Sequence, residues 1–375
     1  MNVLITGGSG FIGTHLARRL LREGCRVSVL DNFNPQVHGN SHDLAPDLAG
    51  KITLYRADIR DKDVLGRALR GQDVIAHLAA ETGTGQSMYE VSRYEQVNLG
   101  GTANLLEILF NDSSRSVKNI VLASSRAVYG EGKYRCKCEG VVYPRGRRME
   151  DLRSGLYEPR CPNCGEPCEA VPTGEDSPFQ PASFYGLTKQ GQEQMILMFA
   201  RVMGISAFAL RYQNVYGPGQ SLKNPYTGIL AIFANQARAN QPIYVFEDGK
   251  ASRDFVYVGD VVEATWRCIS STDSSLEVVN VGSGCRTTIA EVANEVVSVL
   301  AGTSRVEING SFREGDIRHN CADIGKAKSL IGFEPQWKFR DGLREFLHWT
   351  QSQEIHPSAY ESSLLESRER GVLRA

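Results

Sequence analysis

The fold is decided by the stretch Gly7-Gly8-Ser9-Gly10-Phe11-Ile12-Gly13, which joins a short apolar run to an amphipathic segment. Its glycines have the spacing G-x-x-G-x-x-G, a motif that binds a dinucleotide where it links a strand to a helix. Gly7 allows a tight turn, Gly10 lets the backbone approach a pyrophosphate, and Gly13 lets the helix pack on the strand. The helix N-terminus, with Phe11 and Ile12 in its first turn, favours an anion.

Residues after the second and third expected strands indicate which dinucleotide binds. Asp31 ends the second strand, where a carboxylate accepts hydrogen bonds from the adenosine ribose hydroxyls and repels a 2′-phosphate. Asn32, and not an arginine, follows it, so the sequence predicts NAD rather than NADP. Asp58 and Ile59 follow the third strand and are placed to meet the adenine edge. The alternative for Asp58 is a helix cap.

Expected strands and helices alternate through the first half of the chain. The strands are expected at residues 2–6, 26–31, 52–56, 73–77, 119–124 and 207–212, and the helices at 11–23, 61–70, 91–110 and 183–203. Alternation of this kind predicts an α/β fold, a Rossmann-type doubly wound parallel sheet with helices on both faces. Such a sheet binds its ligand at the carboxyl ends of the strands, where the strand order reverses.

The pattern also predicts how the chain is divided. Residues 1–216 are expected to form the NAD-binding domain, interrupted by an insert at 131–172, and residues 217–350 to form mainly a smaller, mixed substrate-binding lobe. The insert is rich in Arg, Gly, Pro and Cys and has no helical or strand period, so a loop of its length needs something to staple it. Residues 351–375 form a polar C-terminal tail.

The composition excludes some classes of partner. The chain is 41% hydrophobic and 23% charged, with a net charge of -1, which is ordinary for a soluble globular protein. Proteins that bind nucleic acid or a membrane surface normally carry a basic excess. No apolar run has the length of a membrane span, and no signal peptide begins the sequence. We therefore expect no nucleic-acid or membrane partner and a cytoplasmic location.

Three residues form a pattern that can perform redox chemistry on a hydroxyl group. Tyr185 and Lys189 lie four residues apart and so share one face of a helix. An ammonium near a phenol favours the phenolate and lowers the pKa of the tyrosine, which suits a base that oxidises a hydroxyl. Ser125, at the end of a strand, can hydrogen-bond the same substrate oxygen.

The chain resembles the extended short-chain dehydrogenase/reductases that act on nucleotide sugars. The resemblance covers nearly all of residues 1–350 and is carried by His77-Leu78-Ala79-Ala80, Ser124-Ser125-Arg126-Ala127-Val128-Tyr129-Gly130, Arg211-Tyr212-Gln213-Asn214-Val215-Tyr216-Gly217-Pro218, Arg253-Asp254-Phe255-Val256-Tyr257-Val258 and Arg313-Glu314-Gly315-Asp316. It implies that Ser125 assists catalysis, that Tyr185 is the base and that Lys189 anchors the nicotinamide ribose.

The same resemblance implies the remaining contacts. Those to the cofactor, besides the residues named above, are Leu78, Ala79, Ala80, Thr82 and Asn98. Those to the nucleotide sugar are Thr84, Ser125, Arg126, Tyr185, Asn214, Arg253, Arg313 and Asp316. Alternatives stay open: Arg253 suits phosphate but also a surface salt bridge, Asn98 also suits a polar helix position against the sheet, and Thr82 and Thr84 also suit simple loop roles.

The residues after Ser125 favour one reaction within this group. In the related 4,6-dehydratases an Asp-Glu pair follows the catalytic Ser or Thr, whereas Arg126 and Ala127 stand here. The resemblance therefore implies epimerisation at C4 without net redox change. Residues 81–88, residues 221–228 and the insert resemble those of dTDP-L-rhamnose 4-epimerases, which interconvert dTDP-L-rhamnose and dTDP-6-deoxy-L-talose. The alternatives are a dehydratase or reductase, a 4-epimerase of a UDP-sugar, and a non-catalytic NAD-sensing protein, which would be expected to lack Tyr185 or Lys189.

Five of the nine cysteines lie between residues 136 and 168. Cys136-Lys137-Cys138 and Cys161-Pro162-Asn163-Cys164 are two knuckles whose separation resembles that of a zinc ribbon, with four thiolates around a structural Zn²⁺. Cys168 is the alternative to Cys138 as the fourth ligand. A reduced loop without metal is the competing interpretation.

The family resemblance also implies a homodimer. The helices expected at residues 91–110 and 183–203 would build a four-helix interface between two copies. The C-terminal tail, with its charged run at residues 366–370, is expected to be disordered or to lie on the partner subunit.

Overall fold

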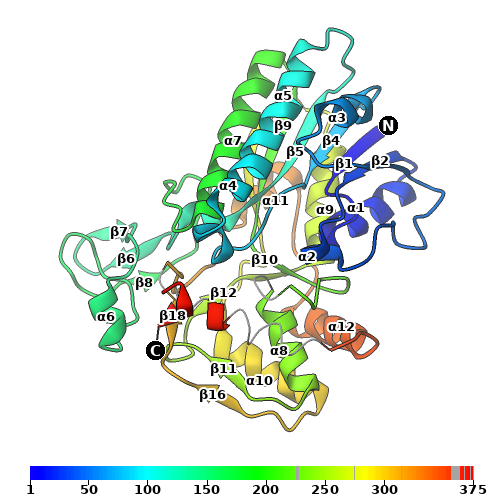
Figure 1. Cartoon of the computed structure of the whole chain (residues 1–375). Helices are drawn as coiled ribbons and strands as arrows, with labels where there is room; N and C mark the ends of the chain where they lie inside the picture. The colour runs from blue at the N-terminus through cyan, green and yellow to red at the C-terminus, as the bar shows by residue number, and fades with distance from the viewer. Residues whose placement is uncertain are drawn as a thin grey trace.

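The computed structural model describes residues 1–224, 228–273, 275–313, 315–355, 364–366, 368–371 and 373–374. Its larger lobe is built on a seven-stranded parallel sheet (Figure 1). The strands in sheet order are β14 (Leu276–Val281), β9 (Ser206–Tyr212), β5 (Asn119–Ser125), β4 (Val74–His77), β1 (Asn2–Thr6), β2 (Arg26–Asp31) and β3 (Thr53–Arg56). The chain thus runs outward from β1 in both directions, and the strand order reverses between β1 and β4.

Helices cover both faces of this sheet. On one face lie α1 (Phe11–Arg22), α9 (Val258–Ile269) and α11 (Gly325–Ile331), and on the other lie α3 (Lys62–Leu69), α5 (Gly101–Asn111) and α7 (Phe184–Met203). Side chains of β1 alternate between the two cores, with Val3 and Ile5 in the first and Leu4 in the second. Alternation in a strand buried on both faces is what a doubly wound sheet requires.

The last strand of the sheet comes from the segment that we expected to belong mainly to the substrate lobe. β14 pairs with β9 from Leu276↔Ala207 to Val281↔Tyr212. The apolar side chains of Val279 and Val281 are fully buried in the core that α1 and α9 share. A strand of this kind has no local signal for the sheet it joins, so its place is decided by tertiary packing.

The helix expected at residues 91–110 is interrupted. It consists of α4 (Val91–Tyr94), the π-helical segment η2 (Glu95–Gly100) and α5. A π-helical turn widens the helix locally and often marks a functional position. Asn98 lies inside this turn and is fully buried.

The smaller lobe packs around its own core. Its helices are α8 (Ile229–Arg238), α10 (Ile289–Leu300) and α12 (Phe339–Gln351), with buried Phe233, Val292 and Phe346 at their contacts. Short strand pairs complete it: β11 (Ile243–Val245) with β16 (Val306–Ile308), β12 (Ser252–Arg253) with β15 (Thr287–Thr288), and β10 (Asn214–Tyr216) with β13 (Phe255–Tyr257). Three further short elements precede the insert in the sequence, namely α2 (Pro35–His38), η1 (Gln86–Met88) and η3 (Arg126–Tyr129).

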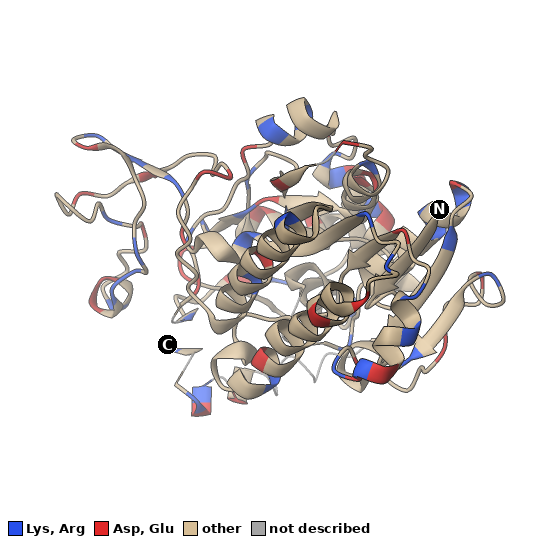
Figure 2. Cartoon of the chain, turned by 90° about the horizontal axis from the view of Figure 1, so that it is seen from above, with Lys and Arg blue, Asp and Glu red and all other residues tan. Residues whose placement is uncertain are grey.

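The insert has regular structure, although its sequence shows no helical or strand period. It forms a three-stranded sheet, in the order β7 (Gly140–Val142), β6 (Tyr134–Cys136) and β8 (Glu169–Ala170), and a short helix α6 (Met149–Arg153). Strands this short show no period in the sequence. The insert projects from the body in two perpendicular views, with basic and acidic residues interspersed along it (Figures 1 and 2).

The two ends of the insert meet where it leaves the body. The Val171 backbone N–H donates to the Lys133 oxygen at 3.1 Å, and the Lys133 N–H donates to the Thr173 hydroxyl at 3.0 Å. β6 and β8 continue this pairing into the insert, with Tyr134 opposite Ala170. The excursion therefore begins and ends at one narrow neck.

Part of the C-terminal tail returns to its own chain. β18 (Leu373–Arg374) pairs antiparallel with β17 (Phe312–Arg313), and Leu373 is buried. The Arg370 guanidinium lies 4.2 Å from the centre of the Tyr89 ring. The expectation that the tail is disordered or lies on a partner is wrong for these residues, while residues 356–363, 367, 372 and 375 lie outside the described part of the chain.

In the part of the chain that the structure describes, no helix is long and apolar enough to cross a membrane.

Candidate active site

The glycine turn, residues 7–13, lies between β1 and α1 with the close contacts that its spacing predicts. Gly7 has φ +69°, and a Cβ atom on it would lie 2.8 Å from the Ala79 nitrogen. A Cβ on Gly13 would lie 2.5 Å from the Gly7 oxygen and 2.6 Å from the Gly8 Cα. Side chains at these positions would push the helix away from the strand, because backbone atoms cannot move aside as flexible side chains do.

The glycine turn leaves room and polar groups for an anion. A Cβ on Gly10 would meet only the Gly7 oxygen, at 3.3 Å. Gly10 is the N-cap of α1 and offers no side-chain cap, so the first N–H groups of the helix have no intrahelical acceptor. The Ser9 hydroxyl beside them is buried and has no hydrogen-bond partner among the described residues. These donors fit the pyrophosphate of a dinucleotide.

Asp31 stands at the end of β2, and its carboxylate is fixed from two sides. One oxygen accepts the Ser9 N–H at 2.9 Å and the other accepts the Phe33 N–H at 2.9 Å. Asp31 is only 6% exposed. Its position beside the glycine turn is where a ribose would need an acceptor.

The two residues singled out after β3, Asp58 and Ile59, have different surroundings. Asp58 accepts from the Asn32 amide at 2.9 Å and from the Arg60 N–H and guanidinium. Burial raises its pKa, but the bonds from Arg60 outweigh this and hold the pKa below its ordinary value. The cap of α3 is Asp61, so the capping alternative for Asp58 is wrong. Ile59 is buried in the core between α3 and α5.

Asn98 fixes the chain that leaves β4. Its amide oxygen accepts the Glu81 N–H at 2.8 Å, and its amide nitrogen donates to the Glu81 oxygen at 3.1 Å and to the Thr188 hydroxyl at 2.9 Å. Asn98 thus ties the loop that follows Leu78-Ala79-Ala80 to α7, which a simple polar helix position against the sheet would not do. Thr82 and Thr84 lie in this loop and are exposed.

Ser125, Tyr185 and Lys189 lie where β5 meets α7. Ser125 ends β5, and its hydroxyl accepts the Ala127 N–H at 3.1 Å. Lys189 is 3% exposed and donates to the Ala123 oxygen at 2.8 Å. Its nitrogen lies 6.0 Å from the centre of the Tyr185 ring. The end of β5 and one face of α7 therefore hold the three side chains together.

The pKa of Tyr185 differs from our expectation. Burial raises it, while the Ser125 hydroxyl and the Arg126 charge act against the rise without cancelling it. Burial also lowers the pKa of Lys189 to about 7, which the Glu193 carboxylate partly opposes. The expected lowering of the Tyr185 pKa is thus wrong, because desolvation at this depth outweighs the Ser125 hydroxyl and the Arg126 charge.

A buried ion pair that the sequence analysis missed lies behind these residues. Arg211 donates to the Glu193 carboxylate at 2.8 Å and to the Tyr129 hydroxyl at 2.8 Å, and the Ser124 hydroxyl bonds to the same carboxylate. Glu193 lies four residues after Lys189 on α7, so the helical spacing from Tyr185 could have revealed it. Arg211 lies in one of the segments that carried the family resemblance.

The expected substrate residues meet at the edge of the smaller lobe. Arg253 is buried, its guanidinium 3.0 Å from a carboxylate oxygen of Asp316, so the surface salt bridge considered for it is wrong. The Asn214 amide oxygen and the Arg313 Nε are buried without a hydrogen-bond partner in the described residues. Burial lowers the pKa of Arg126 to about 10, with Arg253 acting the same way and Asp316 and Tyr185 opposing it. Arg126 is thus electrostatically linked to both groups of site residues.

The five clustered cysteines form two overlapping trios. Sulfur atoms of Cys136, Cys138 and Cys164 lie within 4.8 Å of one another, as do those of Cys136, Cys161 and Cys168. The Cys136 and Cys164 sulfurs are 3.4 Å apart. Thiolates around a tetrahedral zinc would be about 3.8 Å apart. The N–H of Cys138 donates to the Cys136 sulfur at 3.4 Å. Backbone donors of this kind lower the pKa of Cys136 to about 7.

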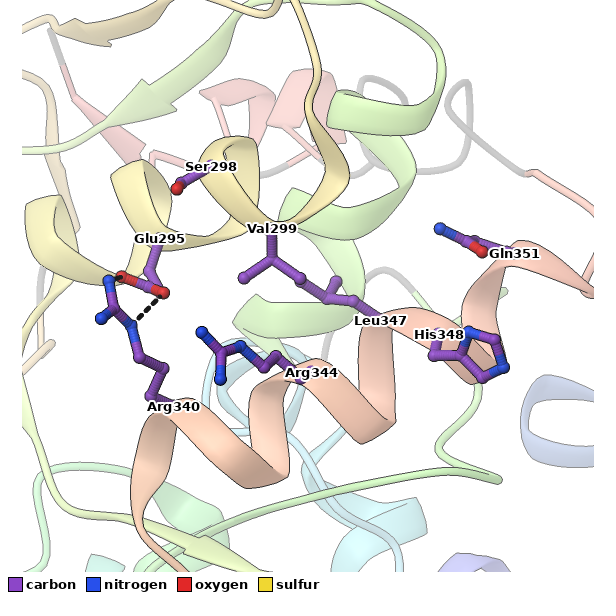
Figure 3. Close-up of a pocket in the computed structure, with 8 residues that line it drawn as sticks. All are labelled: Glu295, Ser298, Val299, Arg340, Arg344, Leu347, His348 and Gln351. Carbon is purple, nitrogen blue, oxygen red and sulfur yellow. Dashed lines mark hydrogen bonds and ion pairs between the residues drawn. The ribbon is translucent and has the colours of Figure 1, made fainter.

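A cavity of about 470 Å³ lies elsewhere, between α10 and α12 (Figure 3). Arg340, Arg344 and His348 line one wall, and Arg340 is paired with Glu295 across it. None of the expected site residues lines this cavity.

Comparisons with known proteins bear directly on the expected site. Residues 3–146 match the NAD dependent epimerase/dehydratase family, and residues 165–346 match a family described as GDP-mannose 4,6 dehydratase. The dTDP-L-rhamnose 4-epimerase of Burkholderia thailandensis is 37% identical over 92% of this chain and 94% of its own length. The chain belongs to the nucleotide-sugar 4-epimerase family.

Solved structures of other nucleotide-sugar 4-epimerases have the same fold. The UDP-N-acetylglucosamine 4-epimerase of Methanobrevibacter ruminantium is 30% identical, with a TM-score of 0.76 over 94% of this chain and 99% of that chain. The UDP-glucose 4-epimerase of Thermus thermophilus, solved in complex with NAD, is 27% identical, with a TM-score of 0.74 over 94% of this chain and 100% of that chain. The predictions of a Rossmann fold, an NAD-dependent isomerase and a nucleotide-sugar substrate are thereby confirmed for this nucleotide-sugar 4-epimerase at the level of its family.

Proposed function

We propose that this chain epimerises C4 of dTDP-L-rhamnose through a transient 4-keto sugar and gives dTDP-6-deoxy-L-talose. The observation that carries the proposal is the unit of Ser125, Tyr185 and Lys189 at the junction of β5 and α7. The choice of sugar is supported by the 37% identity to a dTDP-L-rhamnose 4-epimerase over almost the whole chain.

The glycine turn is proposed to hold NAD. When bound there, NAD would supply the acceptor for the C4 hydride of the sugar and the donor that returns it to the opposite face of C4. Asp31 would accept the ribose hydroxyls, and the free N–H groups of α1 would bind the pyrophosphate. Further proposed contacts, from the strand ends around this position, are Asn32, Asp58, Ile59, Leu78, Ala79, Ala80, Thr82 and Asn98.

Protons are proposed to pass through Tyr185. Its phenolate would accept the proton of the C4 hydroxyl, while the Ser125 hydroxyl donates a hydrogen bond to the same sugar oxygen. Lys189 would stabilise the phenolate and hold the nicotinamide ribose. After the keto sugar turns its other face to the site, Tyr185 would return the proton to the same C4 oxygen, which then has the opposite configuration. No carboxylate follows Ser125 that could remove a proton from C5, because Arg126 and Ala127 stand there.

The sugar nucleotide is proposed to bind between the larger domain, residues 1–216, and the lobe formed mainly by residues 217–350. Arg253 and Arg313 would bind the diphosphate, since a planar guanidinium matches phosphate oxygens. Asn214 and Asp316 would bind neighbouring polar groups, with Thr84 and Arg126 nearer the sugar. The unpartnered polar atoms of Asn214 and Arg313 support this placement.

A mass measurement tests the proposal and its competitors. Incubation with dTDP-L-rhamnose and NAD should give a product of unchanged mass and a changed C4 configuration by NMR. Loss of one water would instead identify a dehydratase. Conversion of UDP-sugars, with none of dTDP-L-rhamnose, would support the second candidate, which the UDP-sugar 4-epimerases among the similar structures favour.

We also propose that the insert, residues 131–172, holds one structural Zn²⁺ through Cys136, Cys138, Cys161 and Cys164. The set fits zinc because several thiols converge, two of them buried, and a backbone N–H already favours the Cys136 thiolate. Elemental analysis of freshly purified, reduced protein should give about one zinc per chain. A chain without zinc would rule the site out.

A homodimer is proposed through α4, α5 and α7. These helices expose apolar side chains that solvent would not favour, among them Phe110, Leu187, Met198 and Val202. α5 and α7 lie side by side in the structure, so two copies would form a four-helix bundle (Figure 1). Light scattering should give twice the mass of the chain. The double variant Met198→Glu and Val202→Glu should give a monomer, and an unchanged mass in that variant would exclude this face.

A further inference from the structure

The insert is joined to the substrate lobe by a group of charges, most of them buried. Arg147 comes from the insert, and Glu247 and Arg318 come from the lobe; Glu158 of the insert, whose side chain is 43% exposed, also bonds to Arg318. The side chains of Arg147 and Arg318 are 3% and 1% exposed. Glu247 accepts from both arginines, at 2.7 Å from Arg147 and 2.8 Å from Arg318. Ions removed from water to this extent are stable only when every partner is in place.

Arg147 does more than pair with Glu247. Its second guanidinium nitrogen donates to the backbone oxygen of Asp316 at 2.9 Å. Its Nε lies 3.4 Å from the carboxylate of Glu131, whose other oxygen accepts the Arg318 N–H at 3.0 Å. The insert thus fixes the backbone of the segment that carries Asp316.

The same segment holds Arg253 from the other side. The Arg253 guanidinium donates to the backbone oxygens of Ile317 and Arg318 and pairs with the Asp316 carboxylate at 3.0 Å. Each hydrogen bond of Arg253 to this segment therefore depends on where the segment lies. The insert, through Arg147, and the smaller lobe, through Arg253, are the two parts of the chain that hold this segment.

We propose that Arg147 is a positioning residue for the substrate site, and that the insert orients Arg253 through residues 316–318. This inference rests on the proposed function only in giving Arg253 the task of binding the diphosphate. It assigns the insert a second role besides the proposed holding of a metal, because the thiols and Arg147 belong to one small folded unit with a small core of its own. Three of the six residues of that core are cysteines.

The test compares Arg147→Met with Arg145→Met, a matched variant of an exposed arginine two residues away in the insert. Arg147→Met should raise the KM for the sugar nucleotide and the Kd for dTDP, measured by calorimetry, by roughly tenfold or more, because small misplacements of binding groups have effects of this size. Its kcat and NAD content should change little. Arg147→Lys should restore part of the affinity, since lysine reaches one acceptor but not three.

Stability is checked separately, because Arg147→Met leaves Glu247 with one partner fewer. The double variant Arg147→Met and Glu247→Gln removes a charge that Arg147 had helped to neutralise, and should fold while keeping the raised Kd for dTDP. Hydrogen exchange at residues 315–319 should speed up in both variants, with exchange in β4 and β5 unchanged.

Two results would overturn the inference. One is an unchanged Kd and unchanged exchange at residues 315–319 in folded Arg147→Met, and the other is an equal loss of affinity in Arg145→Met. Failure of the proposed function looks different: the unaltered chain would then convert no sugar nucleotide, while hydrogen exchange would still report whether Arg147 holds residues 315–319.

Discussion

The ammonium group of Lys189 donates a hydrogen bond to the backbone oxygen of Ala123 at 2.8 Å. Ala123 lies two residues before Ser125 on β5, and Lys189 lies one helical turn after Tyr185 on α7. This bond therefore sets the distance between the strand that carries the serine and the helix that carries the tyrosine. It also holds the ammonium group in a buried position, and burial lowers the pKa of Lys189 to about 7.

Lys189→Met should separate catalysis from stability. Methionine has nearly the same length and no charge to desolvate, so the melting temperature should stay the same or rise. The value of kcat should fall by roughly 10²–10⁴-fold, as expected when proton transfer loses its support. Tyr185→Phe should lose a similar factor with unchanged NAD content. Full activity of Tyr185→Phe would rule out the mechanism.

The pH profile should report Tyr185 and its neighbours. Only the phenolate accepts a proton, and burial raises the pKa of Tyr185, so kcat/KM should increase with pH in the alkaline range. The Arg126 charge holds the Tyr185 pKa lower than it would otherwise be. Arg126→Met should therefore move the rising limb to higher pH, and Arg126→Lys should leave it near its original place. A limb unmoved by Arg126→Met would contradict this assignment.

Alanine substitutions in the glycine turn should have graded effects. A Cβ on Gly10 would lie 3.3 Å from the Gly7 oxygen, a contact that a shift of a few tenths of an ångström relieves, so Gly10→Ala should fold but release the NAD that otherwise copurifies, measured after heat extraction. Gly13→Ala meets backbone atoms at 2.5 Å and should reduce both folding and NAD content. Gly66→Ala is the control in α3, with nothing within 4 Å. It should bind NAD normally and gain about 0.5–1 kcal/mol of stability.

Single serine substitutions should identify the fourth zinc ligand. Cys136 belongs to both trios, so Cys136→Ser should abolish the metal. Cys138→Ser should do the same, and Cys168→Ser should keep it; the reverse result would make Cys168 the ligand. Cys285→Ser, an exposed thiol outside both trios, is the control. Zinc per chain by mass spectrometry is the measurement.

The buried pair behind the catalytic residues should dominate the stability of the larger lobe. Arg211→Met leaves the Glu193 carboxylate, 1% exposed, without its principal partner. The free energy of unfolding in urea should fall by about 3–5 kcal/mol. Arg18→Met breaks an exposed pair with Asp47 and should change that free energy by no more than about 1 kcal/mol. Equal effects from both variants would mean that burial does not govern these pairs.

Features with a local spacing were predictable from the sequence. The glycine turn, Asp31 at the end of β2, and Tyr185 and Lys189 on one helix face follow from periods of two and of three to four residues. Each needs only its immediate neighbours to be recognised. The parallel, doubly wound sheet with helices on both faces followed from the alternation of strands and helices.

Features made by distant pairs were not predictable in this way. Arg147 and Asp316 are separated by 169 residues, and no period links them. β14 and β18 are short segments whose partners are chosen by packing, and the strands of the insert are only two or three residues long. The pKa of Tyr185 was mispredicted because the depth of its burial, which outweighs the nearby charges, is a property of the folded chain.

The hydrogen bonds of Lys133 to Val171 and Thr173 have a consequence for how this protein could have acquired its insert. Because entry and exit lie side by side, the chain between them closes on itself, and the path from β5 to α7 is almost the same length in space with it or without it. Loop closure at such a junction costs little more for a long excursion than for a short one. The insert could thus be gained, lost or grafted at this one junction without changing the topology of the enzyme around it.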